Sequence, residues 1–260
     1  MSGDISRTPG HSTHHPAHQP TNASNATQAT ETPALRDAHL KAAIIDLDGT
    51  MVDTADDFAA ALNGVLRGLD LTLITRDEVM RYIGKGTERL IRDVLASRLT
   101  QEQAEAHYER AYADYFHHYA EVNGQYSHLY PDVAAGLQAL RTLGIRLACV
   151  TNKPERFARD LLTHYALTPY FDAIIGGDTV AHKKPDPMPM LHACTLLNVT
   201  PEQTIAIGDS GNDVAAARAA KMASLTVPYG YNHGEPVQNL PTDAIVSTLL
   251  EAAKLISQHL

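Results

Sequence analysis

Short aliphatic runs alternate with helical patterns along most of the chain, and this alternation restricts the fold more than any other feature. The expected strands lie at 42–46, 145–151, 172–176, 204–208 and 224–227. The helical patterns between them lie at 131–143, 154–167, 187–198 and 213–221. Runs rich in Ile, Val and Ala without polar alternation are typical of strands covered on both faces. The sequence therefore predicts an α/β fold, a doubly wound parallel sheet with a Rossmann-like core, rather than an antiparallel α+β arrangement.

One interval between expected strands is too long for this pattern. Asp46 and Thr151 end consecutive strands but lie 105 residues apart, whereas an ordinary βαβ unit needs roughly 30. The excess, residues 56–128, reads as helical, and its apolar and aromatic residues recur at helical spacing in the segments 75–83, 87–99 and 100–122. We therefore expect a helical cap inserted into a core made of residues 41–55 and 129–260. Such a cap would close over bound substrate and exclude water.

Composition limits the location and the partners of the protein. Residues 1–40 have few large apolar side chains, so we expect a disordered tail. The formal charge of −9, from 30 acidic and 21 basic residues, argues against nucleic acid as a partner. Two cysteines are too few for a disulfide framework, and no apolar run approaches the roughly 20 residues that span a bilayer. These features predict a cytoplasmic protein without a membrane partner, and they leave its oligomeric state open.

Polar clusters follow four of the expected strands at the points where those strands end. They are DLDGT at 46–50, TNK at 151–153, KKP at 183–185 and GDSGND at 208–213. In an open α/β sheet, ligands bind in the crevice outside the carboxyl ends of the strands. We therefore expect the four clusters to form one site for phosphoryl transfer.

The residue types in these clusters suit a metal ion and a phosphoryl group. Asp209 and Asp213 are four residues apart at the start of an expected helix and can present carboxylates on one face. With Asp46 they indicate a hard divalent cation, for which Mg²⁺ is the natural candidate. Thr151 and Asn152 offer a hydroxyl and an amide to the oxygens of a phosphoryl group.

Three lysines lie in or next to these clusters. A lysine in the third cluster would add positive charge at the phosphoryl group, and the adjacent Lys183 and Lys184 leave its register uncertain. We expect Lys153, by contrast, to be solvated or at the rim of the pocket.

The four clusters in this order, with a helical insertion after the first, resemble the haloacid dehalogenase superfamily of phosphatases over residues 41–260. The resemblance implies that Asp46 attacks phosphorus to form an aspartyl-phosphate, and that Asp48 acts as acid and base. It also implies Mg²⁺ bound by Asp46, the main-chain carbonyl of Asp48, and Asp209, with Asp213 orienting ligands or a metal-bound water. The Lys-Pro pattern of the superfamily favours Lys184 over its neighbour.

Several local strings resemble the bacterial phosphoglycolate phosphatases within that superfamily. They are YIGKG at 82–86, VTNKP at 150–154, IGGD at 175–178 and YGYN at 229–232. Gly84, Lys85 and Gly86 would let main-chain amides approach an anion at the start of a helix, although the same residues fit a turn between two cap helices. The resemblance implies Mg²⁺-dependent hydrolysis of 2-phosphoglycolate, a small phosphorylated metabolite, to glycolate and phosphate.

Other functions remain open from the sequence. A related phosphatase acting on a sugar phosphate, such as N-acetylmuramate 6-phosphate, is the nearest alternative, because cap loops change specificity without changing the core. A phosphomutase such as β-phosphoglucomutase would leave the transferred phosphate in its product rather than in solution. A catalytically silent module that binds a phosphorylated ligand is an alternative from another class, and the presence of every acid, base and metal position argues against it.

Overall fold

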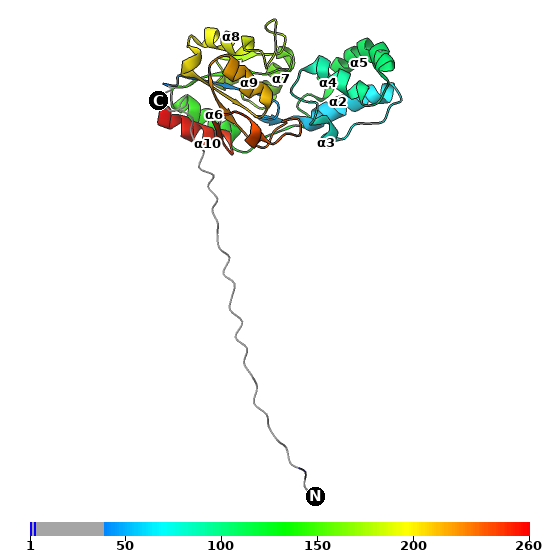
Figure 1. The fold of residues 1–260 in the computed structure, drawn as a ribbon, viewed down its shortest axis with the longest axis horizontal. Coiled ribbons are helices and arrows are strands. Elements are labelled where there is room, and N and C mark those ends of the chain that lie inside the picture. Colours follow the sequence, from blue (N-terminus) through cyan, green and yellow to red (C-terminus); the bar gives the residue numbers. More distant parts are fainter. Residues whose placement is uncertain (2, 4–38) are drawn as a thin grey trace.

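The computed structural model describes residues 1, 3 and 39–260, and a six-stranded parallel sheet lies at the centre of the core (Figure 1). The strands are ordered β5-β4-β1-β6-β7-β8. Their bounds are β1 Ala42–Ile45, β4 Arg146–Val150, β5 Ala173–Ile175, β6 Thr204–Gly208, β7 Ala223–Thr226 and β8 Ala244–Ile245. This order confirms the predicted doubly wound α/β fold. The expected disordered tail lies outside the described residues, except for residues 1, 3, 39 and 40.

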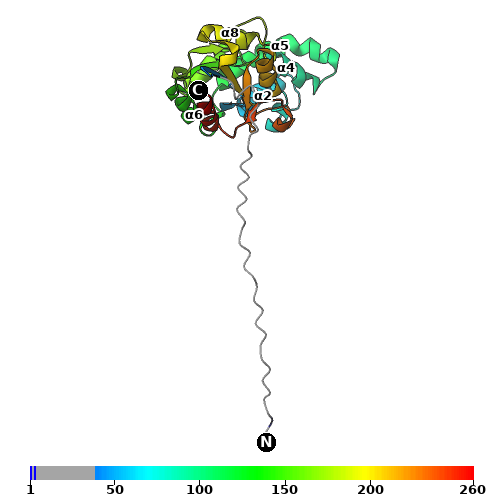
Figure 2. The same cartoon turned by 60° about the vertical axis from the view of Figure 1, so that its left-hand side comes forward.

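Helices cover both faces of the sheet, which explains why its strands carry unbroken aliphatic runs. The covering helices are α6 Val133–Thr142, α7 Glu155–His164, α8 Met188–Leu197, α9 Gly211–Ala219 and α10 Leu249–Ile256. Successive side chains of a strand point to opposite faces, so Ala43 and Ile45 pack with α6, α7 and α10, whereas Ala42 and Ile44 pack with α8 and α9. Figures 1 and 2 show α8 and α6 on opposite sides of the sheet.

The core elements match their predicted positions to within a few residues, but two short features were not anticipated. The first is the last β-α pair, β8 and α10, because the two residues of β8 give no strand pattern. The second is a small antiparallel sheet of β2 (Val52–Asp53) and β3 (His128–Leu129), which pairs the chain leaving the core with the chain returning to it. No helix within residues 39–260 is both long and apolar enough to cross a membrane.

The inserted segment is helical and has a buried cluster of its own. Its helices are α2 Ala55–Gly68, α3 Arg76–Val79, α4 Thr87–Ala96 and α5 Gln101–Val122. The helix expected at 75–83 is wrong in length, because the chain turns after α3 toward Gly84, which has a φ of +103°. Phe157 and Tyr231 of the core join the buried cluster of the cap. We propose that the cap domain spans residues 56–128, since β2 and β3 mark its two connections.

Two buried polar groups fix the connections between core and cap. The fully buried carboxylate of Asp57 accepts the main-chain N–H groups of Gly124 and Tyr126, at 2.8 and 2.7 Å, and so holds the returning chain against α2. The hydroxyl of Tyr231 accepts the N–H groups of Thr54 and Ala55, at 2.8 and 3.0 Å. Because these N–H groups begin α2, the cap starts at a fixed position relative to the core.

Gly136 of α6 allows a close approach to α10. A Cβ atom at this position would lie 2.5 Å from the main-chain carbonyl carbon of Leu249. We expect Gly136→Ala to lower the free energy of unfolding by about 1–2 kcal/mol, because the clash outweighs the gain in helix propensity. Urea denaturation measures the difference. Gly68→Ala at the end of α2 is the control, since nothing lies within 4 Å of its added Cβ, and equal stability of the two variants would contradict the expected clash.

Candidate active site

The loop after β1 brings the DLDGT segment against the end of β6. The N–H of Asp46 donates to the carbonyl of Ile207 at 3.0 Å, which continues the pairing of β1 with β6. Gly49 has a φ of +89°, and a Cβ atom there would lie 2.3 Å from Asp209 Oδ2. Glycine is therefore required at this position, both for the conformation of the backbone and for the contact with Asp209.

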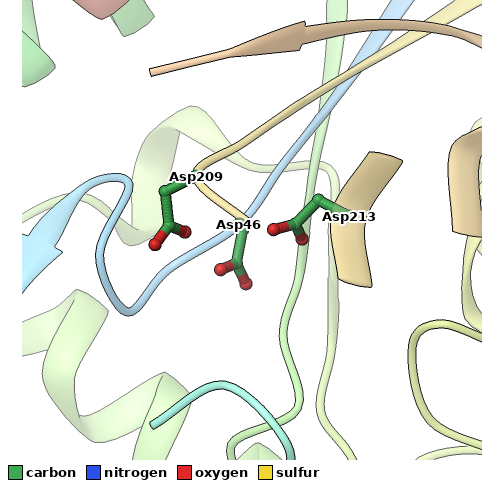
Figure 3. A group of neighbouring side chains, drawn as sticks. All are labelled: Asp46, Asp209 and Asp213. Atoms are coloured by element: carbon green, nitrogen blue, oxygen red, sulfur yellow. The ribbon is translucent and has the colours of Figure 1, made fainter. Parts of the chain in front are cut away.

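Three buried carboxylates from different parts of the sequence meet at these strand ends. One oxygen from each of Asp46, Asp209 and Asp213 lies within 4.8 Å of one from each of the others. Figure 3 shows Asp46 between the other two, with the carboxylates directed toward a common space. Asp46 follows β1, Asp209 follows β6, and Asp213 lies in the first turn of α9. The structure thus brings together three residues that the sequence analysis assigned to a metal site.

Lys184 offsets part of this negative charge. Its ammonium contacts Asp46 Oδ1 at 2.7 Å, Asp213 Oδ1 at 2.6 Å and the carbonyl of Val150 at 2.8 Å. Burial alone would lower the pKa of Lys184, but the charges of Asp213 and Asp46 raise it overall. Lys183 instead lies 3.3 Å from Glu88 of the cap. The geometry therefore places Lys184, and not its neighbour, beside the carboxylates.

The remaining negative charge favours a bound cation. Burial raises the pKa of Asp46 to about 7, with Asp213 and Asp48 adding to the effect and Lys184 opposing it. Burial also raises the pKa of Asp209 well above its ordinary value, as do the charges of Asp213 and Asp46. Within the described part of the chain, no basic side chain forms an ion pair with Asp209, which accepts hydrogen bonds from Thr50 and Tyr231. Carboxylate oxygens with uncompensated charge fit a hard divalent cation.

Asp48 faces a different partner from Asp46. Its Oδ1 accepts hydrogen bonds from Lys153 Nζ at 2.6 Å and from Thr54 Oγ1 at 2.8 Å. The expectation that Lys153 is solvated or at the pocket rim is wrong, because its side chain is only 2% exposed. Its ammonium lies 4.5 and 4.9 Å from the ring centres of Phe58 and Tyr119. The sequence did not reveal this burial, because both rings come from the inserted cap.

Thr151 and Asn152 lie at the end of β4, but their polar atoms are engaged differently. The Thr151 hydroxyl accepts the main-chain N–H of Lys153 at 3.2 Å and lies at the cavity. The Asn152 amide donates to the carbonyls of Lys184 and Gly84, at 2.8 and 2.9 Å, and accepts the N–H of Lys184 at 2.9 Å. Asn152 therefore holds two loops in place, and its contact with substrate stays a prediction.

The cap loop approaches the core through a carbonyl group. The Gly84 carbonyl accepts hydrogen bonds from the amides of Asn152 and Asn212, at 2.9 and 3.1 Å. Gly84 and Gly86 line the cavity between core and cap, whereas Lys85 is exposed and is not part of its lining. The proposed binding of substrate by these three cap residues stays a prediction.

Tyr231 is a positioning residue that the sequence analysis did not assign. Its hydroxyl donates to Asp53 Oδ1 at 2.6 Å, and its main-chain N–H donates to Asp209 Oδ2 at 2.5 Å. It therefore links the start of the cap to one of the three clustered carboxylates, that of Asp209. In the sequence, residues 229–232 served only as part of a resemblance. They could not reveal the contact with Asp53, because the two residues are 178 positions apart.

The space enclosed between the core and the cap is small. The cavity has a volume of about 30 Å³, and its lining includes Asp46, Asp48, Lys153, Lys184 and the cap residues Phe58 and Tyr119. This volume holds only a few water molecules. A larger ligand can therefore enter only when the cap moves away from the core.

Comparison with known proteins agrees with this arrangement. The family model described as haloacid dehalogenase-like hydrolase matches residues 43–227. Two relatives named phosphoglycolate phosphatase, from Thiobacillus denitrificans and Nitrosospira multiformis, are 42% and 45% identical, and each alignment covers 84% of this chain and 96% of the relative. The crystal structure of a predicted phosphoglycolate phosphatase from Haemophilus somnus is similar with a TM-score of 0.79 and 30% identity, over 84% of this chain and 98% of that chain.

Replacement of Lys184 tests its role as the buried counter-charge. We expect Lys184→Met to lower the free energy of unfolding at pH 8 by about 3–5 kcal/mol, because it leaves buried carboxylates without their cation. Denaturant unfolding in the absence of divalent cations measures the change. Lys183→Met is the matched control and should change stability by less than about 0.5 kcal/mol, since its pair with Glu88 is at the surface. Similar losses in both variants would contradict the assignment.

Proposed function

The chain belongs to the haloacid dehalogenase-like hydrolases, and we propose that it hydrolyses 2-phosphoglycolate to glycolate and phosphate. The two relatives named phosphoglycolate phosphatase, which align with 84% of this chain, support the substrate. The observation that carries the chemistry is the position of Asp46. Its buried carboxylate lies at the end of the central strand, 2.7 Å from Lys184 and beside Asp209. A nucleophile there is held rigidly while the cap excludes water.

The proposed reaction has two steps, each with a defined group on the protein. In the first step, an oxygen of Asp46 attacks phosphorus and the bond to the glycolate oxygen breaks, while Asp48 gives that oxygen a proton. In the second step, Asp48 takes a proton from water, which attacks the aspartyl-phosphate and releases phosphate. Lys184 and the hydroxyl of Thr151 stabilise the phosphoryl oxygens. Thr54 and Lys153 hold Asp48 in position.

We propose Mg²⁺ as the cofactor, bound by Asp46, the main-chain carbonyl of Asp48, and Asp209. The raised pKa values of Asp46 and Asp209 support a cation at this point. When bound, the ion would supply positive charge that offsets the repulsion between Asp46 and the phosphoryl oxygens. Asp213 accepts hydrogen bonds from Lys184 and Ser210, which suits it to orient groups around the ion.

We also propose that the protein acts on a small metabolite in the cytoplasm. Cys149 and Cys194 are both free and buried, which is usual in a reducing compartment. The relatives named phosphoglycolate phosphatase support a small phosphorylated substrate.

Replacement of the nucleophile tests the reaction directly. We expect Asp46→Asn to reduce phosphate release from 2-phosphoglycolate by roughly 10⁴-fold or more, because the amide cannot form the acyl phosphate. A phosphate assay measures the rate, and circular dichroism checks that the fold is retained. Asp70→Asn, at an exposed carboxylate beyond the end of α2, is the control. Activity of Asp46→Asn within tenfold of wild type would rule out Asp46 as the nucleophile.

The substrate is tested by rates on a panel of esters. We expect kcat/KM to be highest for 2-phosphoglycolate when it is compared with N-acetylmuramate 6-phosphate and glucose 1-phosphate. Phosphate should appear in solution and not in a glucose 6-phosphate product, as a mutase would give. A preference for either sugar phosphate would reject the proposed substrate while leaving the phosphatase chemistry intact.

Binding of the cation should depend on pH in a defined direction. The raised pKa of Asp46, about 7, means that the folded protein holds a proton there below pH 7, and the proton competes with the cation. We therefore expect MgCl₂ to stabilise the protein at pH 8, by about 2.7 kcal/mol at 100 times the dissociation constant, and much less at pH 5.5. Thermal unfolding measures the effect. An undiminished effect in Asp209→Asn would place the ion elsewhere.

A further inference from the structure

The ammonium of Lys153 has hydrogen-bonding capacity that the described residues do not use. Asp48 Oδ1, at 2.6 Å, is its single hydrogen-bond acceptor among them. An ammonium has three N–H donors, and Lys184 uses all of its own on Asp46, Asp213 and Val150. The Lys153 side chain is only 2% exposed and lines the cavity between core and cap. Two donors of this buried cation therefore form no hydrogen bond among the described residues, and the ammonium lies over the rings of Phe58 and Tyr119.

A second unpaired donor lies on the cap side of the same cavity. Tyr119 of α5 is 1% exposed, and its hydroxyl has no hydrogen-bond partner among the described residues. A buried hydroxyl without a partner costs about 1–3 kcal/mol, and phenylalanine would fill the same space without this cost. Tyr119 lines the cavity, and its ring centre is 4.9 Å from Lys153 Nζ. Core and cap thus each contribute to the lining of this cavity a residue whose donor is not fully used by the described residues.

We propose that Lys153 and Tyr119 form the subsite for a carboxylate on the leaving group of the substrate, an inference that rests on the proposed phosphatase function. The two oxygens of a carboxylate accept several hydrogen bonds, enough for the free N–H donors of Lys153 and the hydroxyl of Tyr119. Hydrogen bonds between ionised partners are also stronger than neutral ones. A hydroxyl of a sugar would accept from these donors but would bring no negative charge to the buried ammonium.

The position of Lys153 relative to the acid sets the length of the leaving group. Asp48 must reach the leaving oxygen to protonate it, and Lys153 Nζ lies 2.6 Å from Asp48 Oδ1. In 2-phosphoglycolate the carboxylate is a single methylene away from the leaving oxygen. A carboxylate bound at Lys153 would therefore keep that oxygen beside Asp48. The ring of Phe58, with its centre 4.5 Å from Lys153 Nζ, closes the subsite on the cap side. The subsite thus favours phosphate esters of short 2-hydroxy acids.

A pair of substrates isolates the contact with the carboxylate. Ethyl phosphate has a methyl group where 2-phosphoglycolate has its carboxylate. We expect Lys153→Met to lower kcat/KM for 2-phosphoglycolate about 100-fold more than for ethyl phosphate, because only the former loses a charged hydrogen bond. The loss common to both substrates measures the effect of Lys153 on Asp48. Equal losses for the two substrates would overturn the subsite.

Tyr119→Phe removes only the unpaired hydroxyl. We expect KM for 2-phosphoglycolate to rise about tenfold with a smaller change for ethyl phosphate, and the melting temperature to stay the same or rise, because the hydroxyl has no partner to lose. Tyr112→Phe, on the same helix but outside the lining of the cavity, is the control for kinetics and stability. An unchanged KM for 2-phosphoglycolate in Tyr119→Phe would exclude its hydroxyl from the subsite.

Binding to an inactive protein separates this inference from the proposed function. If the wild type does not hydrolyse 2-phosphoglycolate, the proposed substrate is wrong, and the subsite is still tested by calorimetry with Asp46→Asn and MgCl₂. Adding Lys153→Met to that variant should weaken binding of 2-phosphoglycolate at least tenfold more than binding of ethyl phosphate. An equal effect on both ligands would overturn the subsite, whatever the turnover of the wild type.

Discussion

The structure depends on compensating several negative charges in one buried space. Asp46 and Asp48 are two residues apart in the same loop, yet each has its own buried lysine: Lys184 lies 2.7 Å from Asp46, and Lys153 lies 2.6 Å from Asp48. Unpaired buried charges would cost several kcal/mol each, so the two lysines make this close pair of carboxylates tolerable. Asp209 is left without a basic partner among the described residues. A divalent cation would supply the missing charge there.

The order of the strands explains how these charges are separated. Both lysines follow strands on one side of β1, since Lys153 comes after β4 and Lys184 after β5. Asp209 and Asp213 follow β6, on the other side. Asp46, at the end of β1, therefore lies between a basic side and an acidic side that would hold the cation. The doubly wound topology, with its chain reversal at β1, thus gives Asp46 basic side chains on one side and carboxylates on the other.

The parts of this arrangement that depend on local sequence could be predicted, and the parts that depend on contacts between distant segments could not. Aliphatic runs followed by polar residues located the strand ends at Asp46, Thr151 and Asp209. This was possible because the aliphatic run and the polar residues after it lie within a few residues of each other in the sequence. The burial of Lys153 escaped prediction because the rings that cover it come from α2 and α5, and a lysine after a strand usually reaches solvent. The link from Tyr231 to Asp53 joins residues 178 positions apart, and no pattern in one sequence reports such a pair.

The contacts of the two buried lysines come from different parts of the molecule. The pairs of Lys184 with Asp46 and Asp213 lie entirely within the core, so the pairing of Asp46 with its lysine does not require a closed cap. The space around Lys153 is complete only when Phe58 and Tyr119 of the cap cover it. Asn152 connects core and cap, because its amide donates hydrogen bonds to the Lys184 carbonyl in the core and to the Gly84 carbonyl in the cap. Under the proposed function, closure of the cap should therefore control which leaving group is accepted, whereas the ion pair of Asp46 with Lys184 forms within the core.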